Sequence, residues 1–123
     1  APFVKLDDLI KGREKLSEGR WKGVVAATEF SFPVHRSFKL LPSGGAEMIF
    51  PEHYKTRSQD LPTVYHDAGQ FYWLRSIDCL GEPLGFGPDT TIVAVPHWRV
   101  QDIDNLEDWN RAELIWKLLK KLN

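Results

Sequence analysis

The sequence predicts an α/β fold, because helical and extended patterns alternate along a chain of 123 residues. Two short apolar runs rich in β-branched residues, 23–30 and 90–95, are typical of buried strands. The strongest helical pattern covers 105–122, where apolar residues recur every three or four positions. The chain has 42% apolar and 27% charged residues, which is an ordinary globular composition. We therefore expect a single domain over residues 1–123.

The first half of the chain predicts a helix, a strand and a hairpin. Residues 5–16 carry Leu and Ile near helical spacing, although Gly12 weakens the middle of the helix. After the first strand, an extended stretch over 32–41 contains a proline, which favours a sheet edge or a bend. A turn signal at 43–45 separates it from extended residues 46–50. These two stretches predict a β-hairpin that projects from the α/β body.

The second half predicts two strands and a capped helix. The polar segment 51–61 is expected to form a loop that includes one helical turn. Aromatic residues dominate 65–74, which favours a strand. The Gly- and Pro-rich segment 81–89 predicts a loop before the strand at 90–95. Asp104 or Asn105 is suited to cap the last helix, and acidic residues in its first turn favour the positive end of the helix dipole.

Charge and composition exclude several classes of protein. The net charge is −1 and the basic residues are scattered, which argues against nucleic acid as a partner. No apolar run approaches the roughly 20 residues that a membrane helix needs, and the first residues lack the pattern of a signal peptide. Cys79 is the single cysteine, so no intrachain disulfide forms, and we expect a buried structural thiol in a cytoplasmic protein.

Two carboxylates follow the strand at 90–95. Asp102 and Asp104 lie two positions apart in an extended stretch, so both side chains can converge on one point. Two hard oxygen donors suit Mg²⁺, which takes one or two carboxylates together with phosphate and water. The alternative is that these residues only begin and cap the following helix. Spacing alone leaves both interpretations open.

Two further segments carry polar groups that suit a binding site. Arg57 and Gln59 lie two apart in the loop and can hold a carboxylate and a hydroxyl-rich ligand; an Arg57–Asp60 pair that only ties down the loop is the simpler interpretation. His66 next to Asp67 suggests a general base. Neighbours on a strand point to opposite faces, however, so this adjacency does not predict a catalytic dyad.

Four motifs in register resemble one known family. They are the sequences Phe-Ser-Phe-Pro-Val-His-Arg at 30–36, Arg-Ser-Gln-Asp-Leu at 57–61, Tyr-His-Asp-Ala-Gly-Gln-Phe-Tyr at 65–72, and Val-Gln-Asp-Ile-Asp at 100–104 with Glu-Asp-Trp at 107–109. Over nearly the whole chain they resemble the pseudaminic acid cytidylyltransferases, relatives of the acylneuraminate and Kdo cytidylyltransferases. The residues at 69–72 favour pseudaminic acid or a close nonulosonic acid over sialic acid.

The resemblance implies a partial nucleotide-diphosphosugar transferase fold, a Rossmann-like three-layer α/β/α sandwich. It implies that CTP and a nonulosonic sugar acid react, with Mg²⁺, to give a CMP-sugar and pyrophosphate. The sugar hydroxyl would attack the α-phosphate in line, with catalysis by positioning and charge neutralisation.

The resemblance also assigns residues and partners. Asp102 and Asp104 match metal-binding aspartates, and Arg57 and Gln59 match a sugar-facing loop that in relatives reaches across a dimer. The residues that fall where the sugar pocket is walled are Gln70, Phe71 and Tyr72. A homodimer is therefore expected.

One departure from the family is expected to matter. Family members carry a strand and a basic Gly-rich loop that cradles CTP, and the match places that N-terminal nucleotide-binding half outside this chain. We therefore expect the 123-residue polypeptide to be inactive alone. The alternative is a non-catalytic truncated remnant that acts as a small dimeric binding or interaction protein, with exposed strand edges paired in the dimer.

Overall fold

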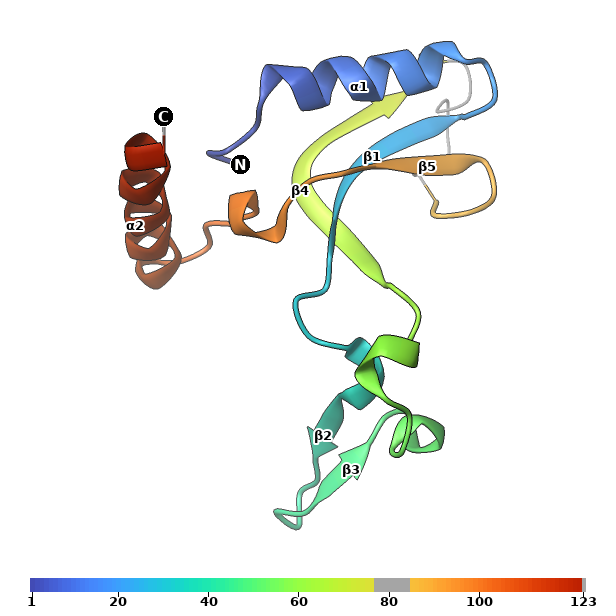
Figure 1. The fold of residues 1–123 in the computed structure, drawn as a ribbon, viewed down its shortest axis with the longest axis vertical. Coiled ribbons are helices and arrows are strands. Elements are labelled where there is room, and N and C mark those ends of the chain that lie inside the picture. The colour runs from blue at the N-terminus through green and yellow to red at the C-terminus, as the bar shows by residue number, and fades with distance from the viewer. Residues whose placement is uncertain (77–84, 123) are drawn as a thin grey trace.

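The computed structural model describes residues 1–76 and 85–122, and Figure 1 shows how its elements are arranged. Cys79 and the first part of the predicted loop at 81–89 lie outside the described residues. Along the chain the helices and strands are α1 (Leu6–Ser17), β1 (Gly23–Glu29), β2 (Phe38–Leu40), β3 (Ala46–Met48), β4 (Tyr65–Leu74), β5 (Thr90–Ala94) and α2 (Leu106–Leu122). Short 3₁₀ turns lie at Val34–Arg36, Pro51–His53, Ser58–Asp60 and His97–Arg99.

A mixed three-stranded sheet forms the centre of the body. Its strand order is β4-β1-β5, and β1 pairs antiparallel with β4 and parallel with β5. The central strand β1 is buried over residues 23–28, as expected for a strand with a neighbour on each side. The predicted α/β class is confirmed, and each predicted strand and helix is present within two or three residues of its expected bounds, the hairpin strands excepted.

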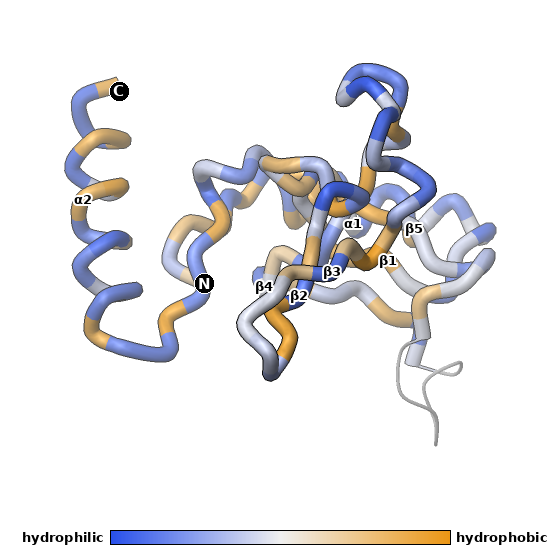
Figure 2. The backbone as a smooth tube through the Cα atoms, turned by 90° about the horizontal axis from the view of Figure 1, so that it is seen from below, coloured by the Kyte–Doolittle hydropathy of each residue, from blue (hydrophilic) through white to orange (hydrophobic). Residues whose placement is uncertain are grey.

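Helix α1 covers one face of this sheet (Figure 1). Beneath it lies an apolar core to which β1, β4 and β5 all contribute, and the apolar course of β1 is visible in Figure 2. Gly12 lies where α1 crosses β4: a Cβ atom there would be 2.6 Å from Cδ1 of Trp73 and 3.0 Å from Cε2 of Phe71. The glycine that weakens the helical pattern therefore permits the close approach of helix and sheet.

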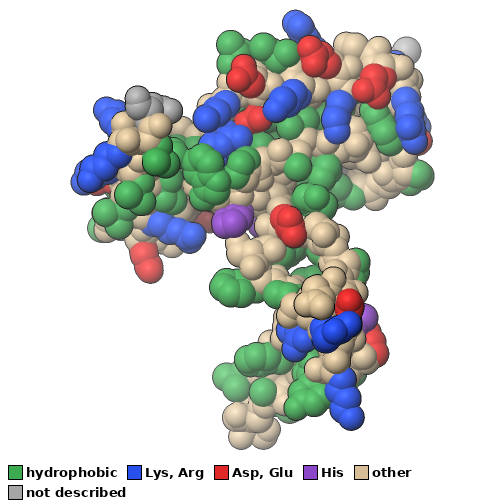
Figure 3. Space-filling model, in the orientation of Figure 1, with side chains coloured by type: hydrophobic (Ala, Val, Ile, Leu, Met, Phe, Trp, Pro, Cys, Tyr) green, Lys and Arg blue, Asp and Glu red, His purple; other side chains and the backbone are tan. Residues whose placement is uncertain are grey.

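The predicted hairpin is confirmed as a two-stranded arm, β2 with β3, that projects away from the body (Figures 1 and 3). Its strands are three residues each, shorter than expected, because a 3₁₀ turn at Val34–Arg36 takes up the proline-containing part of the first stretch. The arm exposes large apolar side chains, among them Phe38 and Leu40, which are 67% and 77% exposed.

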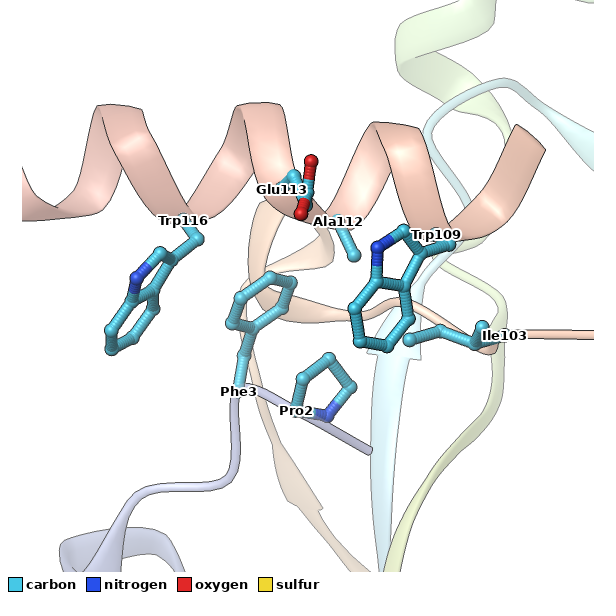
Figure 4. A pocket seen from close by; sticks show the side chains of 7 residues that line it. All are labelled: Pro2, Phe3, Ile103, Trp109, Ala112, Glu113 and Trp116. Carbon is cyan, nitrogen blue, oxygen red and sulfur yellow. The ribbon is translucent and has the colours of Figure 1, made fainter. Parts of the chain in front are cut away.

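Helix α2 lies beside the sheet and not on its face (Figure 1). Asn105 caps it as predicted: its Oδ1 accepts from the backbone N of Asp108 at 2.9 Å, and Asp108 Oδ2 accepts in return from the N of Asn105 at 3.3 Å. Trp109 and Trp116 face Pro2 and Phe3 across a 350 Å³ hollow, as Figure 4 shows.

Because α2 does not cover the second face of the sheet, the expected three-layer α/β/α sandwich stays a prediction.

No helix within residues 1–76 or 85–122 combines the length and the apolar character needed to cross a membrane.

Candidate functional site

A hollow of 580 Å³ lies between the start of β4 and the segment that leads into α2. The residues that line it are His66, Asp67, Ala68, Gly69, Tyr72, Val100, Gln101, Asp102, Asp104, Asp108 and Arg111. Three of the predicted binding and metal-site residues are thus brought to one place, since Tyr72 lies near Asp102 and Asp104 although about 30 residues of the chain separate it from them. We refer to this feature as the acidic hollow, since four of its lining side chains are carboxylates.

An irregularity in β4 shapes one wall of the acidic hollow. Val25 of β1 pairs with Tyr72, but Ala27, only two residues on, pairs with Asp67, five residues earlier in β4. The extra residues bulge out of the ladder, and Gly69 takes a φ of +62°, a left-handed conformation that suits glycine. Residues five apart on a regular strand face opposite sides. The bulge therefore brings Asp67 and Tyr72 to the same side.

Asp67 accepts hydrogen bonds both from the backbone of the bulge and from the Tyr72 side chain. Its Oδ1 accepts from the backbone N of Gly69 at 2.7 Å, and its Oδ2 accepts a hydrogen bond from the Tyr72 hydroxyl. The pKa of Tyr72 is raised above its ordinary value of 10.0, chiefly by the hydrogen bond to Asp67, and further by partial burial and by the negative charge of Asp67. Tyr72 therefore stays protonated, and so a donor to Asp67, at neutral pH.

The opposite wall carries the predicted metal-binding aspartates. Asp102 and Asp104 are both exposed toward solvent, whereas Asp108 is engaged with the backbone at the start of α2. Because Asn105 provides the cap, the alternative in which Asp104 caps the helix is not needed to explain its position. Over residues 1–76 and 85–122, no three His, Asp or Glu side chains are grouped so as to hold a metal ion by themselves.

Two carboxylates at the mouth of an open hollow nevertheless fit Mg²⁺. This ion is usually bound by one or two protein carboxylates and keeps its remaining positions for phosphate oxygens and water. The donor set of Asp102 and Asp104 is of that kind. It does not fit a structural Zn²⁺ site, which needs four protein ligands, usually thiolate or imidazole.

Buried contacts to α1 and β4 anchor the segment that leads to these aspartates. Arg99 Nη1 lies 2.8 Å from Asp8 Oδ2, and both side chains are more than nine-tenths buried. Gln70 Nε2 donates to the backbone O of Arg99 at 2.8 Å. The ion pair ties α1, and the hydrogen bond ties β4, to the turn just before Gln101. The backbone that presents Asp102 is thus fixed by buried contacts.

Two of the predicted pocket residues do not reach the acidic hollow. Gln70 makes the backbone contact described above, and Phe71 is 9% exposed and packs in the core beneath α1. Of the three residues expected to line the sugar pocket, Gln70, Phe71 and Tyr72, only Tyr72 lines this hollow. The cause is the alternation of side chains along β4, which turns Tyr72 to the site and its neighbour Phe71 to the core.

The loop that carries Arg57 and Gln59 lies between the arm and β4 (Figure 1), and neither residue lines the acidic hollow. Arg57 Nε pairs with Asp60 Oδ2 at 3.0 Å, and both side chains are exposed. This is the pair expected if Arg57 only ties down the loop. Gln59 lines a second hollow of 300 Å³, formed with residues 29–34 and 61–64. Within one chain, Arg57 and Gln59 are therefore not joined to Asp102 and Asp104.

Sequence reasoning missed Asp67 and Arg111 as lining residues of the acidic hollow. The signal for Asp67 was present, because Asp followed two positions later by Gly is typical of a turn in which the carboxylate accepts the glycine N–H. His66 and Asp67 form no dyad, as expected: His66 Nδ1 lies 2.9 Å from the backbone O of Asp67.

No family model matches the chain. Among curated proteins, it is 38% identical over 118 residues to the pseudaminic acid cytidylyltransferase of Campylobacter jejuni serotype O:2, and 37% identical over 118 residues to that of serotype O:23/36. These alignments cover 96% of this chain and 51% of each relative. A third relative, from Helicobacter pylori, is named a pseudaminic acid cytidylyltransferase and UDP-2,4-diacetamido-2,4,6-trideoxy-beta-L-altropyranose hydrolase. It is 49% identical over 49 residues, which are 40% of this chain and 9% of that protein.

The chain spans about half the length of the Campylobacter relatives it matches. The motifs that carry the resemblance are spread over residues 30–109, and the similarity to the first of these relatives extends over 118 residues. The chain is thus a relative of the pseudaminic acid cytidylyltransferases, similar to them over almost its entire length.

Proposed function

We propose that this chain supplies the sugar-facing part of a cytidylyltransferase that activates pseudaminic acid, a nonulosonic acid, with CTP to give CMP-sugar and pyrophosphate. The observation that carries the proposal is the acidic hollow, where Tyr72 of β4 and the aspartates Asp102 and Asp104 share one cavity. The similarity to the Campylobacter enzymes supports the same reaction class.

The acidic hollow suits a cation-dependent reaction on a triphosphate. Exposed carboxylates alone would repel an anionic substrate, so Asp102 and Asp104 need a bridging cation before a phosphate can approach. When bound there, Mg²⁺ would neutralise charge on phosphate oxygens. The protein would hold the backbone that carries the two carboxylates. The buried Asp8–Arg99 pair anchors the segment before them, and the Asn105 cap anchors the segment after them.

A thermal shift with Mg²⁺ tests the assignment of Asp104. We expect Mg²⁺ to raise the melting temperature of the wild-type chain, because an ion that binds only the folded state stabilises it. Asp104→Asn should abolish this shift. Its control is Asp7→Asn, which removes another exposed aspartate, from the first turn of α1. An equal Mg²⁺ response in the wild type and in Asp104→Asn would remove Asp104 from the metal site.

A chimera tests the reaction. The 123-residue polypeptide spans half of its relatives, and we expect it to form no CMP-sugar by itself from CTP, Mg²⁺ and pseudaminic acid. Placed in the Campylobacter enzyme in exchange for the 118 aligned residues, it should restore the reaction. In this chimera Asp104→Asn should be inactive and Asp7→Asn active. A folded chimera that binds CTP but forms no CMP-pseudaminic acid would refute the proposed substrate.

We further propose that two copies of the chain pair through the arm. A two-stranded sheet is marginally stable alone in water, and this one exposes Phe38 on β2 together with Ile49 just after β3. A second copy would cover these side chains and account for the distance of Arg57 from the acidic hollow of its own chain. The same surface favours the alternative of a non-catalytic dimeric binding protein.

Sedimentation velocity distinguishes these outcomes. The wild type should sediment as a dimer, and Phe38→Ser combined with Leu40→Ser should sediment as a folded monomer. A wild type that stays monomeric at all accessible concentrations would refute pairing through the arm. A dimer whose chimera with the Campylobacter enzyme lacks activity would favour the binding protein over the transferase.

A further inference from the structure

We propose that Asp67 is a positioning residue for Tyr72: it accepts the hydrogen bond of the Tyr72 hydroxyl, so that the phenol oxygen faces the acidic hollow as an acceptor and selects a hydroxyl or amide N–H group of the substrate. The inference rests on the proposed function and adds to it a rule for which part of a sugar acid can lie against β4.

The geometry that carries the inference is the bulge in β4. It joins Asp67 and Tyr72 on one side of the strand, and Gly69 closes the turn between them by donating its N–H to Asp67 Oδ1 at 2.7 Å. Asp67 Oδ2 is left for the Tyr72 hydroxyl. The carboxylate is held by the backbone on one oxygen, so its other oxygen has a fixed place with respect to the phenol.

The proton count then sets the direction of the remaining bonds. An ionised carboxylate only accepts hydrogen bonds, whereas a phenol has one proton to donate and lone pairs that accept. Since that proton lies in the hydrogen bond to Asp67, Tyr72 can offer a ligand only its lone pairs. The side chain is 49% exposed, so the oxygen can be reached from the hollow.

The pKa of Tyr72 agrees with this arrangement. It is raised first by the hydrogen bond to Asp67, then by partial burial and by the charge of Asp67. The phenol therefore keeps its proton throughout the neutral range, and the proton stays on the side of Asp67.

The charged side chains around Tyr72 also favour hydrogen-bond donors of the ligand over its carboxylate. Asp102, Asp104 and Asp108 also line the hollow and offer acceptors, whereas Arg111 is the fixed positive charge among its described lining residues. A ligand carboxylate placed against Tyr72 would meet lone pairs and negative charge. A hydroxyl or an acetamido N–H would instead donate to the phenol oxygen. The sugar is thus expected to turn its donor groups to β4 and its carboxylate away from it.

Calorimetric titration of the wild-type chain with pseudaminic acid, compared with three variants, tests the inference. In Asp67→Asn the amide oxygen can still accept from Gly69, but the amide N–H₂ now donates to Tyr72, which reverses the phenol. We expect Asp67→Asn to weaken sugar binding about three- to tenfold, the worth of one hydrogen bond. Tyr72→Phe should weaken it at least as much, and Asp67→Asn should add nothing in the Tyr72→Phe background. Asp7→Asn controls for the lost charge.

A spectroscopic titration of the phenol accompanies the binding measurement. The difference between the ultraviolet pH titrations of the wild type and of Tyr72→Phe isolates Tyr72 from the other tyrosines. Its pKa should lie above 10.0 in the wild type and fall in Asp67→Asn. An ordinary Tyr72 pKa in the wild type would overturn the pairing, whether or not the Asp67→Asn variant folds.

The outcomes separate this inference from the proposed function. If the wild type binds the sugar acid and Asp67→Asn binds it equally, or if the two substitutions act additively, then Asp67 does not act through Tyr72 and the inference is wrong while the proposed function stands. If the wild type does not bind the sugar acid, the proposed function and the inference both fall.

Discussion

Replacing Gly12 by alanine tests how closely α1 and β4 are packed. On helix propensity alone, the change should stabilise the protein by about 1 kcal/mol. The structure predicts the opposite sign. The added Cβ would lie 2.6 Å from Cδ1 of Trp73, well inside ordinary contact distance, and 3.0 Å from Phe71. The helix or the ring must therefore move.

Neither can move freely. Trp73 Nε1 donates to the backbone O of Leu9 at 3.0 Å, so a displaced ring loses that hydrogen bond. Overpacking of a core costs about 1–3 kcal/mol, and the lost hydrogen bond adds about 1 kcal/mol. Against a propensity gain of about 1 kcal/mol, we expect Gly12→Ala to lower the free energy of unfolding by about 1–3 kcal/mol.

Urea denaturation followed by circular dichroism at 222 nm measures this difference. Arg13→Ala, at an exposed position of the same helix, should change stability by less than about 0.5 kcal/mol. In a Trp73→Leu background, where the closest contact is gone, Gly12→Ala should become neutral or stabilising. A stabilising Gly12→Ala in the wild-type background would show that α1 does not approach β4 as described.

Three more predictions follow from contacts around the sheet and the site. Asp8→Ala or Arg99→Ala alone should destabilise the chain by about 3–5 kcal/mol in urea, because each leaves a buried charge unpaired; the combination of Asp8→Leu with Arg99→Met should recover most of this loss, and no recovery would argue against a direct pair. Asn105→Ala should cost about 1 kcal/mol and reduce protection of the first amides of α2 in hydrogen exchange; unchanged protection there would contradict its role as the cap. Because the Asp67 hydrogen bond raises the pKa of Tyr72, the absorbance of its phenolate should develop only at a pH above its ordinary value of 10.0, and Asp67→Ala should bring it down; a Tyr72 titration that Asp67→Ala leaves in place would count against the bond.

The elements of the body could be predicted because their patterns are local. The β-branched run of β1 and the three- and four-residue spacing in α2 specify a strand and a helix whatever lies beside them. The Asn105 cap is equally local, since it involves only the first turn. The meeting of Asp102, Asp104 and Tyr72 was expected from the resemblance and not from any pattern in the residues.

The features that escaped prediction depend on distant contacts. Residues 65–74 read as one even strand, and only the pairing with β1 reveals the bulge that brings Asp67 to the same side as Tyr72. Gly12 looked unfavourable for a helix because its reason lies across the sheet, in Trp73. Likewise, the distance of Arg57 from the aspartates is set by the direction of the arm, which no local pattern encodes.

The hollow that Phe3 lines together with the two tryptophans of α2 brings the opposite ends of the sequence together. Phe3 is 6% exposed, whereas Trp109 and Trp116 remain about half exposed, so the first few residues cover only part of the apolar side of the helix. An affinity tag or a cleavage scar at the amino terminus is therefore expected to alter the fluorescence and the fraying of α2, while the emission of Trp73 beneath α1 stays unchanged.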